Sequence, residues 1–336
     1  MQTRTGIGLA LLSAATFGTS GTFARSLIDA GWSAPAAVTA RVGIAALILT
    51  VPTIIAVRGR GATMRRSLGA IGTFGLLAVA GAQVCFFNAV RFLPVGIALL
   101  LEYLGIILVV LWMWARHRQR PRRLTLAGSA LAAIGLILVL NVTGTDTIDI
   151  RGVAWGLGAA VGLAAYFVLS ARADADLPSV AMAGTGLAVG ALALLALGAA
   201  GALPMHATSA DVQFAGRTTS WLVPVIGLSV VGAVLAFVTG IAAARALGAR
   251  LSSFVGLTEV LFAALFAWFL LGELPVPVQL GGGLLIIAGV VLVRIDEQQG
   301  SGNRIDAIDL GERDAEPIYD LDAEPVASFA GPRGVQ

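Results

Sequence analysis

The stretch Leu99-Leu-Leu-Glu-Tyr-Leu-Gly-Ile-Ile-Leu-Val-Val-Leu-Trp112 aligns without gaps on Gly256-Leu-Thr-Glu-Val-Leu-Phe-Ala-Ala-Leu-Phe-Ala-Trp-Phe269. Each run is apolar apart from one glutamate, Glu102 in the first and Glu259 in the second. A charged side chain near the middle of a bilayer costs roughly 2.5–3.5 kcal/mol on insertion scales, so such residues are usually functional. Two of them at matching places in one chain indicate a duplicated membrane transporter.

The composition is that of an integral membrane protein. Of 336 residues, 57% are hydrophobic and only 12% are charged, with a mean hydropathy of +0.90. A soluble domain carries nearer a quarter charged residues, so this chain has too little polar surface to face water. We therefore expect an all-α protein embedded in the lipid bilayer.

Enzymatic and metal chemistry are not indicated. One cysteine, Cys85, excludes an intrachain disulfide and a thiolate zinc cluster. The two histidines, His117 and His206, lie near expected membrane edges, so we expect no metal centre and no cofactor. The sequence has no Walker-type phosphate loop and no nucleophile–His–Asp arrangement, which argues against an enzyme.

About 20 helical residues span the hydrocarbon core of a bilayer. On that measure the chain contains ten candidate spans, at roughly 6–27, 34–57, 67–89, 94–115, 124–142, 151–172, 178–200, 221–245, 251–271 and 275–293. We divide them into a first repeat at 1–145 and a second at 146–295. Because five is odd, the second repeat must enter the membrane from the opposite side, which predicts an inverted repeat.

Arginine placement predicts the orientation. The loops after the second and fourth spans are rich in arginine: Arg58, Arg60, Arg65, Arg66, Arg116, Arg118, Arg120, Arg122 and Arg123. The alternate loops hold few basic residues, so the positive-inside rule places both termini on the cytoplasmic side of the cytoplasmic membrane. Since these arginines lie in short loops and not in one patch, nucleic-acid binding is not expected.

The last part of the chain changes character. Residues 296–336 hold 3 arginines and 10 acidic residues, with three prolines and no helical period. We expect a disordered acidic cytoplasmic tail.

A second internal match supports the duplication. Ala89-Val-Arg-Phe-Leu-Pro94 ends the third expected helix and Ala243-Ala-Arg-Ala-Leu-Gly248 ends the eighth. Proline and glycine at the same place predict a turn at each corner. The register between corner and glutamate differs by three residues, about one helical turn.

The two glutamates are expected near the membrane centre. Each is the ninth residue of its helix, which places it about 12 Å from its starting face and about 6 Å from the other in depth. One interpretation is a transport role, by protonation or by attraction of an ammonium group. The alternative is a protonated, hydrogen-bonded link between helices.

Other polar groups are candidates for the same cavity. Arg41 lies about 10 Å below the outer face by helical rise and either snorkels to the headgroups or faces the cavity. There it would pair with a glutamate or bind a substrate carboxylate. The further candidates for pocket lining are Gln83, Asn88, Tyr103, Tyr166 and Thr258.

These features resemble the drug/metabolite transporter superfamily, and within it the EamA-like carriers with two five-helix repeats. The markers are Ala40-Arg41, Leu99–Gly105, Gly256–Glu259, and Leu270-Leu-Gly-Glu273 followed by Gln279–Gly282. The pairing of the two glutamate segments is most similar to the threonine/homoserine exporters. The resemblance implies a carrier that moves small metabolites outward through a central cavity.

One departure from that branch concerns the helices that carry the glutamates. Proline often follows the glutamates there, whereas this chain has Ile106 and Val260. We therefore expect these two helices to lack a break.

Three functions remain open at this point. The first is a secondary transporter that exports an amino acid or similar metabolite by alternating access, with the proton as a coupling-ion option. The second is an efflux carrier for multiple drugs or cationic compounds. The third is a non-transporting scaffold that acts through its acidic tail. Substrate identity, direction of flux and oligomeric state are left open.

Overall fold

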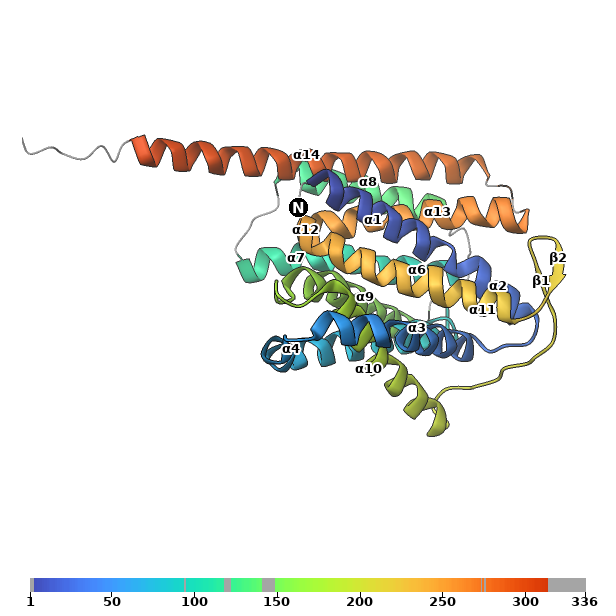
Figure 1. Cartoon of the computed structure of the whole chain (residues 1–336). Coiled ribbons are helices and arrows are strands. Elements are labelled where there is room, and N and C mark those ends of the chain that lie inside the picture. Colours follow the sequence, from blue (N-terminus) through green and yellow to red (C-terminus); the bar gives the residue numbers. More distant parts are fainter. Residues whose placement is uncertain are drawn as a thin grey trace, which may run out of the picture. The chain divides into compact units, whose positions relative to one another are not determined.

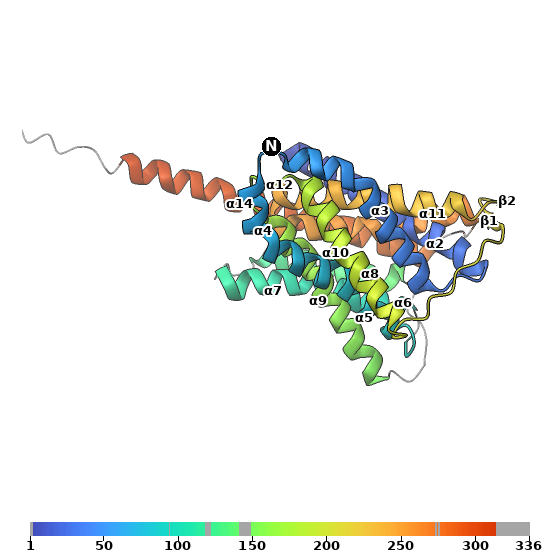
Figure 2. The ribbon, with the colours of Figure 1, turned by 60° about the horizontal axis from the view of Figure 1, so that its bottom comes forward.

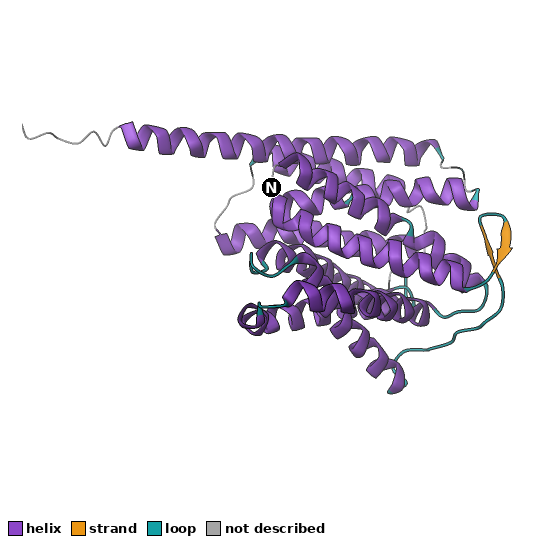
Figure 3. Cartoon of the chain, in the orientation of Figure 1, coloured by secondary structure: helices purple, strands orange, loops and turns teal. Residues whose placement is uncertain are grey.

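The computed structural model describes residues 3–93, 95–117, 122–140, 149–272, 274 and 276–313. The chain divides into a body, Met1–Asp296, and a terminal segment, Glu297–Gln336. In the body the described residues are almost all helical, and the helices pack side by side (Figures 1 and 3).

The first half of the body contains eight α-helices and one π-helix among its described residues. These are α1 (Thr3–Gly18), α2 (Ser20–Asp29), α3 (Ala34–Val57), α4 (Gly61–Thr73), η1 (Phe74–Gly81), α5 (Ala82–Ala89), α6 (Val95–Tyr103), α7 (Gly105–His117) and α8 (Arg123–Val139).

The second half repeats this pattern of long and interrupted helices. Its elements are α9 (Ile150–Arg172), α10 (Ser179–Ala199), α11 (Leu222–Ser229), η2 (Val230–Leu235), α12 (Ala236–Gly256), α13 (Thr258–Phe266), η3 (Ala267–Leu271) and α14 (Pro277–Arg313).

Eight helical stretches in the described residues are long and apolar enough to cross a membrane. They are Thr3–Asp29, Ala34–Val57, Gly61–Ala89, Ile97–Arg116, Ile150–Arg172, Ser179–Ala199, Leu222–Gly256 and Pro277–Asp296. Two shorter apolar helices, Arg123–Val139 and Thr258–Leu270, coincide with the other expected spans. A membrane protein with many apolar helices is thus confirmed, while the count of ten crossings stays a prediction.

Helices at equivalent places in the two halves run in opposite directions. On α8 and α14, Gly128 packs against Gly289 and Gly135 packs against Gly282. The contacts move seven residues toward the C-terminus on α8 and seven residues toward the N-terminus on α14, so the two helices are antiparallel. On α3 and α10, Thr53 Oγ1 donates to the Val180 carbonyl oxygen at 3.3 Å, and Leu49 lies against Gly184. Both pairs are antiparallel, as an inverted repeat requires.

The corner between the third and fourth helices is also repeated. Leu247 lies against Gly6 of α1, where a Cβ would come 2.8 Å from its Cδ2 atom. Leu93 lies against Gly152 of α9, where a Cβ would come 2.5 Å from its Cγ atom. Each first helix therefore inserts into the other half, α1 against α12 and α13, and α9 against α5, α6 and α7 (Figure 2). Gly248 has φ +78°, which confirms a turn there; Pro94 lies outside the described residues.

Each helix that carries a glutamate has an irregular hydrogen bond at one residue, so the expectation of fully regular helices is not met, although the backbone at Leu257 keeps α-helical dihedrals. Leu104 N donates to Leu101 O and Leu257 N donates to Phe254 O, each at 3.1 Å, in place of the regular α-helical bond. Proline is not needed, because Gly105 lets α7 approach the Ala160 carbonyl oxygen of α9. The Thr258 hydroxyl bonds back to the Val255 carbonyl oxygen at 2.7 Å. Close packing at glycine and such back-bonding both bend helices.

A β-hairpin lies in the connection between α10 and α11. Strands β1 (Val212–Phe214) and β2 (Arg217–Thr219) pair antiparallel around Ala215 and Gly216, both with positive φ. Two such residues form the tight turn that suits a two-residue hairpin. Phe214 stacks on Phe23 of α2 at 5.1 Å between ring centroids, which fixes the hairpin to the body.

The terminal segment begins as helix. Since α14 extends from Pro277 to Arg313, a helix occupies the first part of the stretch expected to be disordered. Residues 297–313 contain no proline, so no residue in this stretch forces the helix that begins at Pro277 to end earlier. The rest of the expected tail, 314–336, lies outside the described residues.

Candidate functional site

The charged residues singled out in the sequence come from three helices and meet inside the body. Glu102 lies in α6, Glu259 in α13 and Arg41 in α3, and all three are half-buried. Glu259 is within electrostatic range of Arg41 and of Glu102. Among the described residues no ion pair within 4.0 Å joins them. The group therefore brings one cation and two carboxyl groups together without pairing them off.

Arg41 faces the interior and does not snorkel outward. Its Nη2 atom donates to the carbonyl oxygen of Gly232 in η2. Its Cζ atom lies 5.5 Å from the centre of the Phe17 ring, a cation–π contact. Its Nε atom is buried and meets no hydrogen-bond partner in the described part of the chain. Because a buried N–H group that is left unpaired is costly, this atom is suited to an acceptor brought by a ligand.

Gly232, whose carbonyl oxygen accepts a hydrogen bond from Arg41, lies in the π-helical turn η2. A π-helix replaces the i→i−4 bonds with i→i−5 bonds and commonly marks a functional site. Both η1 and η2 end twelve residues before the corner leucine of their half, at Gly81 before Leu93 and at Leu235 before Leu247. Both repeats thus contain a π-helical turn at this place, and among the described residues it is η2 that accepts a hydrogen bond from an arginine, Arg41.

The two glutamates lie on opposite sides of equivalent helix breaks. The breaks at Leu104 and Leu257 follow the corner leucines by eleven and ten residues. Glu102 precedes its break, in the last turn of α6, whereas Glu259 follows its break, in the first turn of α13. The three-residue register difference in the sequence is thus real, and the glutamates are not structurally equivalent. Glu259 is within electrostatic range of Arg41, whereas Glu102 has Glu259 as its charged neighbour, so the two carboxyl groups have different surroundings.

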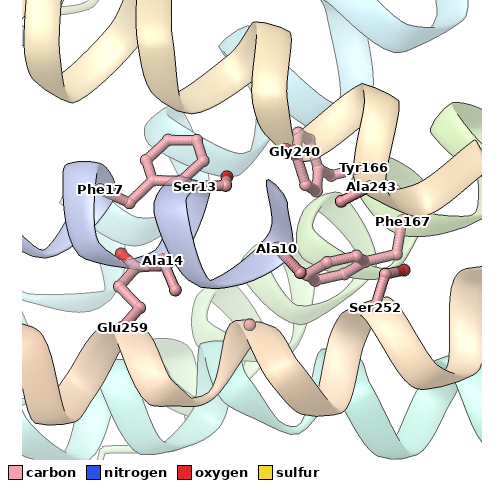
Figure 4. Close-up of a pocket in the computed structure, with 11 residues that line it drawn as sticks. Ala10, Ser13, Ala14, Phe17, Tyr166, Phe167, Gly240, Ala243, Ser252 and Glu259 are labelled. Atoms are coloured by element: carbon pink, nitrogen blue, oxygen red, sulfur yellow. The ribbon is translucent and has the colours of Figure 1, made fainter. Parts of the chain in front are cut away.

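Glu259 lines a small cavity between α1, α9, α12 and α13 (Figure 4). The cavity has a volume of about 30 Å³, and its walls are Ala10, Ser13, Ala14, Phe17, Tyr166, Phe167, Gly240, Ala243, Ser252, Gly256 and Glu259. Three aromatic rings therefore surround a few polar atoms. The Tyr166 hydroxyl is buried and has no well-formed hydrogen bond among the described residues, although the Ser13 hydroxyl lies beside it.

The other sequence candidates divide into two groups. Tyr166 lines the cavity with Glu259, and Tyr103 is within electrostatic range of both glutamates. Asn88 instead donates to the Val84 carbonyl oxygen of its own helix at 2.8 Å, and Thr258 bonds back to Val255. Gln83 is half-buried in α5. The geometry thus gives Asn88 and Thr258 local structural contacts.

Tyr103 also borders a second, apolar cavity of about 150 Å³ between α6, α7, α8 and α12. Its walls are mostly Leu, Ile and Ala, with Ser129 as the other polar residue. It offers no charged group to a ligand and lies beside the break at Leu104.

Sequence reasoning missed Ser13, Phe17 and Gly240. Ser13 lies three residues before Thr16 on the same face of α1, a spacing that could have identified it. Phe17 and Gly240 have no such signal, because their roles depend on α3 and α9 coming close. In the described ranges no three His, Cys, Asp or Glu side chains gather as a metal site.

Comparison with known proteins fits this architecture. Residues 4–141 and 150–295 each match the EamA-like transporter family. The chain belongs to the EamA-like transporter family. The two matches confirm the two repeats, and a drug/metabolite-type membrane transporter acts on a small-molecule substrate within lipid.

Solved structures support the fold of this EamA-like transporter. One described only as "Crystal structure of protein" superposes with a TM-score of 0.70 at 20% identity, over 88% of this chain and 98% of its own. Among curated protein sequences none matches. At 20% identity the likeness concerns the fold alone.

Proposed function

We propose that this EamA-like transporter exports an amino acid or a similarly small zwitterionic metabolite, of the threonine or homoserine kind, by alternating access. The observation that carries the proposal is that Glu259 lies within electrostatic range of Arg41 and of Glu102 inside the body, with no ion pair joining them among the described residues. An amino acid carries one carboxylate and one ammonium group. The site offers a complement to each.

Arg41 is assigned to the substrate carboxylate. Guanidinium binds carboxylate through parallel N–H groups in a fixed fork, and the Nε atom of Arg41 has no partner of its own in the described chain. The corresponding part of α10, at Gly184-Thr185-Gly186, has no charge. An arginine present in one repeat only suits an asymmetric substrate.

Glu259 is assigned to the substrate ammonium and Glu102 to the coupling proton. Glu259 lines the cavity and lies within electrostatic range of the Arg41 guanidinium, so it is placed to meet a substrate ammonium. Glu102 lies within electrostatic range of Glu259 but does not line the cavity. A carboxyl group that is coupled to the binding residue without touching the substrate is suited to carrying the coupling proton.

The cavity beside Glu259 has room for one polar group of a substrate and not for a whole molecule, so the helices must rearrange around any substrate that enters. A volume of about 30 Å³ holds only one or two water molecules. Drug-sized ligands need clefts of roughly 300–1,000 Å³. The helix breaks and π-turns around the site provide places where the helices can rearrange as access alternates.

Metabolite profiling tests this proposal without prior choice of substrate. Cells that express the protein are compared with cells that express Glu259→Gln at equal membrane abundance. We also expect both termini to lie in the cytoplasm and the net movement of substrate to be outward. We expect one or a few amino acids to accumulate in the medium of the first culture only. Identical media, or a difference confined to hydrophobic cations, would contradict the proposal.

A further inference from the structure

The small cavity presents acceptors to whatever occupies it. Ser13 Oγ donates its proton to the Ala236 carbonyl oxygen at 2.8 Å, so towards the cavity it offers lone pairs only. Ser252 likewise donates to Gly248, at 2.6 Å. The Tyr166 hydroxyl is buried, in a residue only 6% exposed, and makes no well-formed hydrogen bond among the described residues. Its proton can turn to the neighbouring Ser13 Oγ, which leaves its own lone pairs for the cavity. Glu259 adds a carboxyl group, and no cationic side chain lines the cavity.

The remaining walls also favour a cation. Phe17, Tyr166 and Phe167 border the cavity, and ring faces attract positive charge. Phe17 contacts both ends of the site, since its ring lies 5.5 Å from Arg41 Cζ and 6.2 Å from the Tyr166 ring centre. Figure 4 shows Ser13 and Phe17 on the side of α1 that is turned toward Gly240 and Tyr166, while Glu259 lies beside Ala14.

Gly240 keeps the cavity open. A Cβ atom at this position would come 2.6 Å from Ser13 Oγ and still closer to the Tyr166 hydroxyl. The two hydroxyl oxygens therefore converge on a position in α12 where no side chain stands. The space that remains suits a group of one heavy atom with several N–H donors.

We propose that this cavity is a subsite for a primary ammonium group, with Tyr166 and Ser13 as hydrogen-bond acceptors and Glu259 as the counter-charge. A quaternary ammonium is too large for about 30 Å³ and has no N–H to donate. The inference deepens the proposed function, because the ammonium would be that of the exported amino acid while its carboxylate meets Arg41 Nε. It makes Tyr166 a specificity-determining residue for primary amines.

Binding of methylammonium tests the subsite without a transported substrate. The purified full-length protein in detergent is titrated with methylammonium chloride and, separately, tetramethylammonium chloride at matched ionic strength, and the thermal unfolding midpoint is followed. We expect a saturable rise with methylammonium only. Equal effects of the two salts would mean that the cavity holds water alone, and would overturn the subsite.

Three variants locate the effect. Tyr166→Phe removes one hydroxyl and should weaken methylammonium binding about tenfold, the usual effect of losing a hydrogen bond to a charged group. Gly240→Ala fills the cavity and should abolish binding. Ser170→Ala is the matched control, because it removes another buried, unpartnered hydroxyl one turn further along α9, outside the cavity. Unchanged binding in Tyr166→Phe would overturn the proposal even if Gly240→Ala does not fold.

The outcome separates the two proposals. Amino-acid export without methylammonium binding would refute the subsite and leave the proposed function standing. Selective methylammonium binding without amino-acid export would support the subsite and refute the choice of substrate.

Discussion

Arg41 of α3 donates a hydrogen bond to the main-chain carbonyl oxygen of Gly232 in η2. At the equivalent contact in the other half, α10 meets η1 without a cation, through the close approach of Gly186 and Gly75. The two halves therefore pack their π-helical turn against the neighbouring helix differently. The first π-turn, η1, meets glycine, whereas the second, η2, meets Arg41, which lies beside Glu259.

Replacing Arg41 by lysine should weaken binding of the transported amino acid about tenfold. The charge remains, but an ammonium cannot hold the Gly232 carbonyl oxygen and grip a carboxylate with parallel N–H groups at the same time. Equilibrium binding of the labelled amino acid to purified protein measures this.

Arg245→Lys is the matched control for this variant. Arg245 also donates to a main-chain carbonyl oxygen, that of Leu177, at a distance from the cavity. We expect a lower unfolding temperature with unchanged affinity. A similar loss of affinity in both variants would show that Arg41 acts through stability.

The two glutamates should fail differently when made neutral. Glu259→Gln should lower substrate affinity about tenfold or more, because it removes the counter-charge. Glu102→Gln should leave exchange of internal for external substrate but remove the response of net flux to a pH gradient. Vesicle flux with and without the gradient separates the two, and the double variant should show no flux. Indistinguishable single variants would contradict the assigned division of roles.

The sequence predicted the repeat and the three-residue offset between its corner and its glutamate, but it could not decide which of the two alignments is structural. Motif similarity aligns Glu102 with Glu259. The fold instead aligns Leu93 with Leu247, because each must fit a glycine of the other half. Contacts between halves determine the register, and a pattern within one segment cannot show them.

The candidate site was predicted where a polar residue stands out in an apolar helix, as Arg41 and Tyr166 do. It was missed where a residue becomes important only through its neighbours. Ser13 resembles any serine of α1 until the Tyr166 hydroxyl is found beside it. Asn88 shows the converse, since its conspicuous amide bonds its own helix.

The crossing of α8 and α14 should not tolerate a single added methyl group. In Gly282→Ala the new Cβ would lie 2.6 Å from the Gly135 carbonyl oxygen, an overpacking that costs about 1–3 kcal/mol. Gly281→Ala is the adjacent control, since nothing lies within 4 Å of its Cβ. Unfolding in mixed detergent micelles should show a lower free energy of unfolding for the first variant only. Equal stability of the two would contradict the antiparallel glycine contact.

Removing the terminal segment should leave transport intact. The body, Met1–Asp296, contains both repeats and every residue of the candidate site. Truncation after Asp296 should therefore preserve net flux within about twofold. Loss of one hydrogen bond to a charged group would instead lower binding about tenfold. Flux per inserted molecule in vesicles is the measurement. Loss of a cellular phenotype with preserved flux would favour the scaffold function for the segment.

Counterflow in proteoliposomes tests the central claim most directly. Vesicles loaded with one unlabelled amino acid are diluted into a trace of the same labelled amino acid, and each of the twenty and homoserine is tried in turn. The wild-type protein should accumulate at least one label, and Glu259→Gln and Arg41→Lys should each reduce the initial rate about tenfold at low substrate concentration. Accumulation of none of these labels, or equal rates in the variants, would contradict a zwitterion site between Arg41 and Glu259.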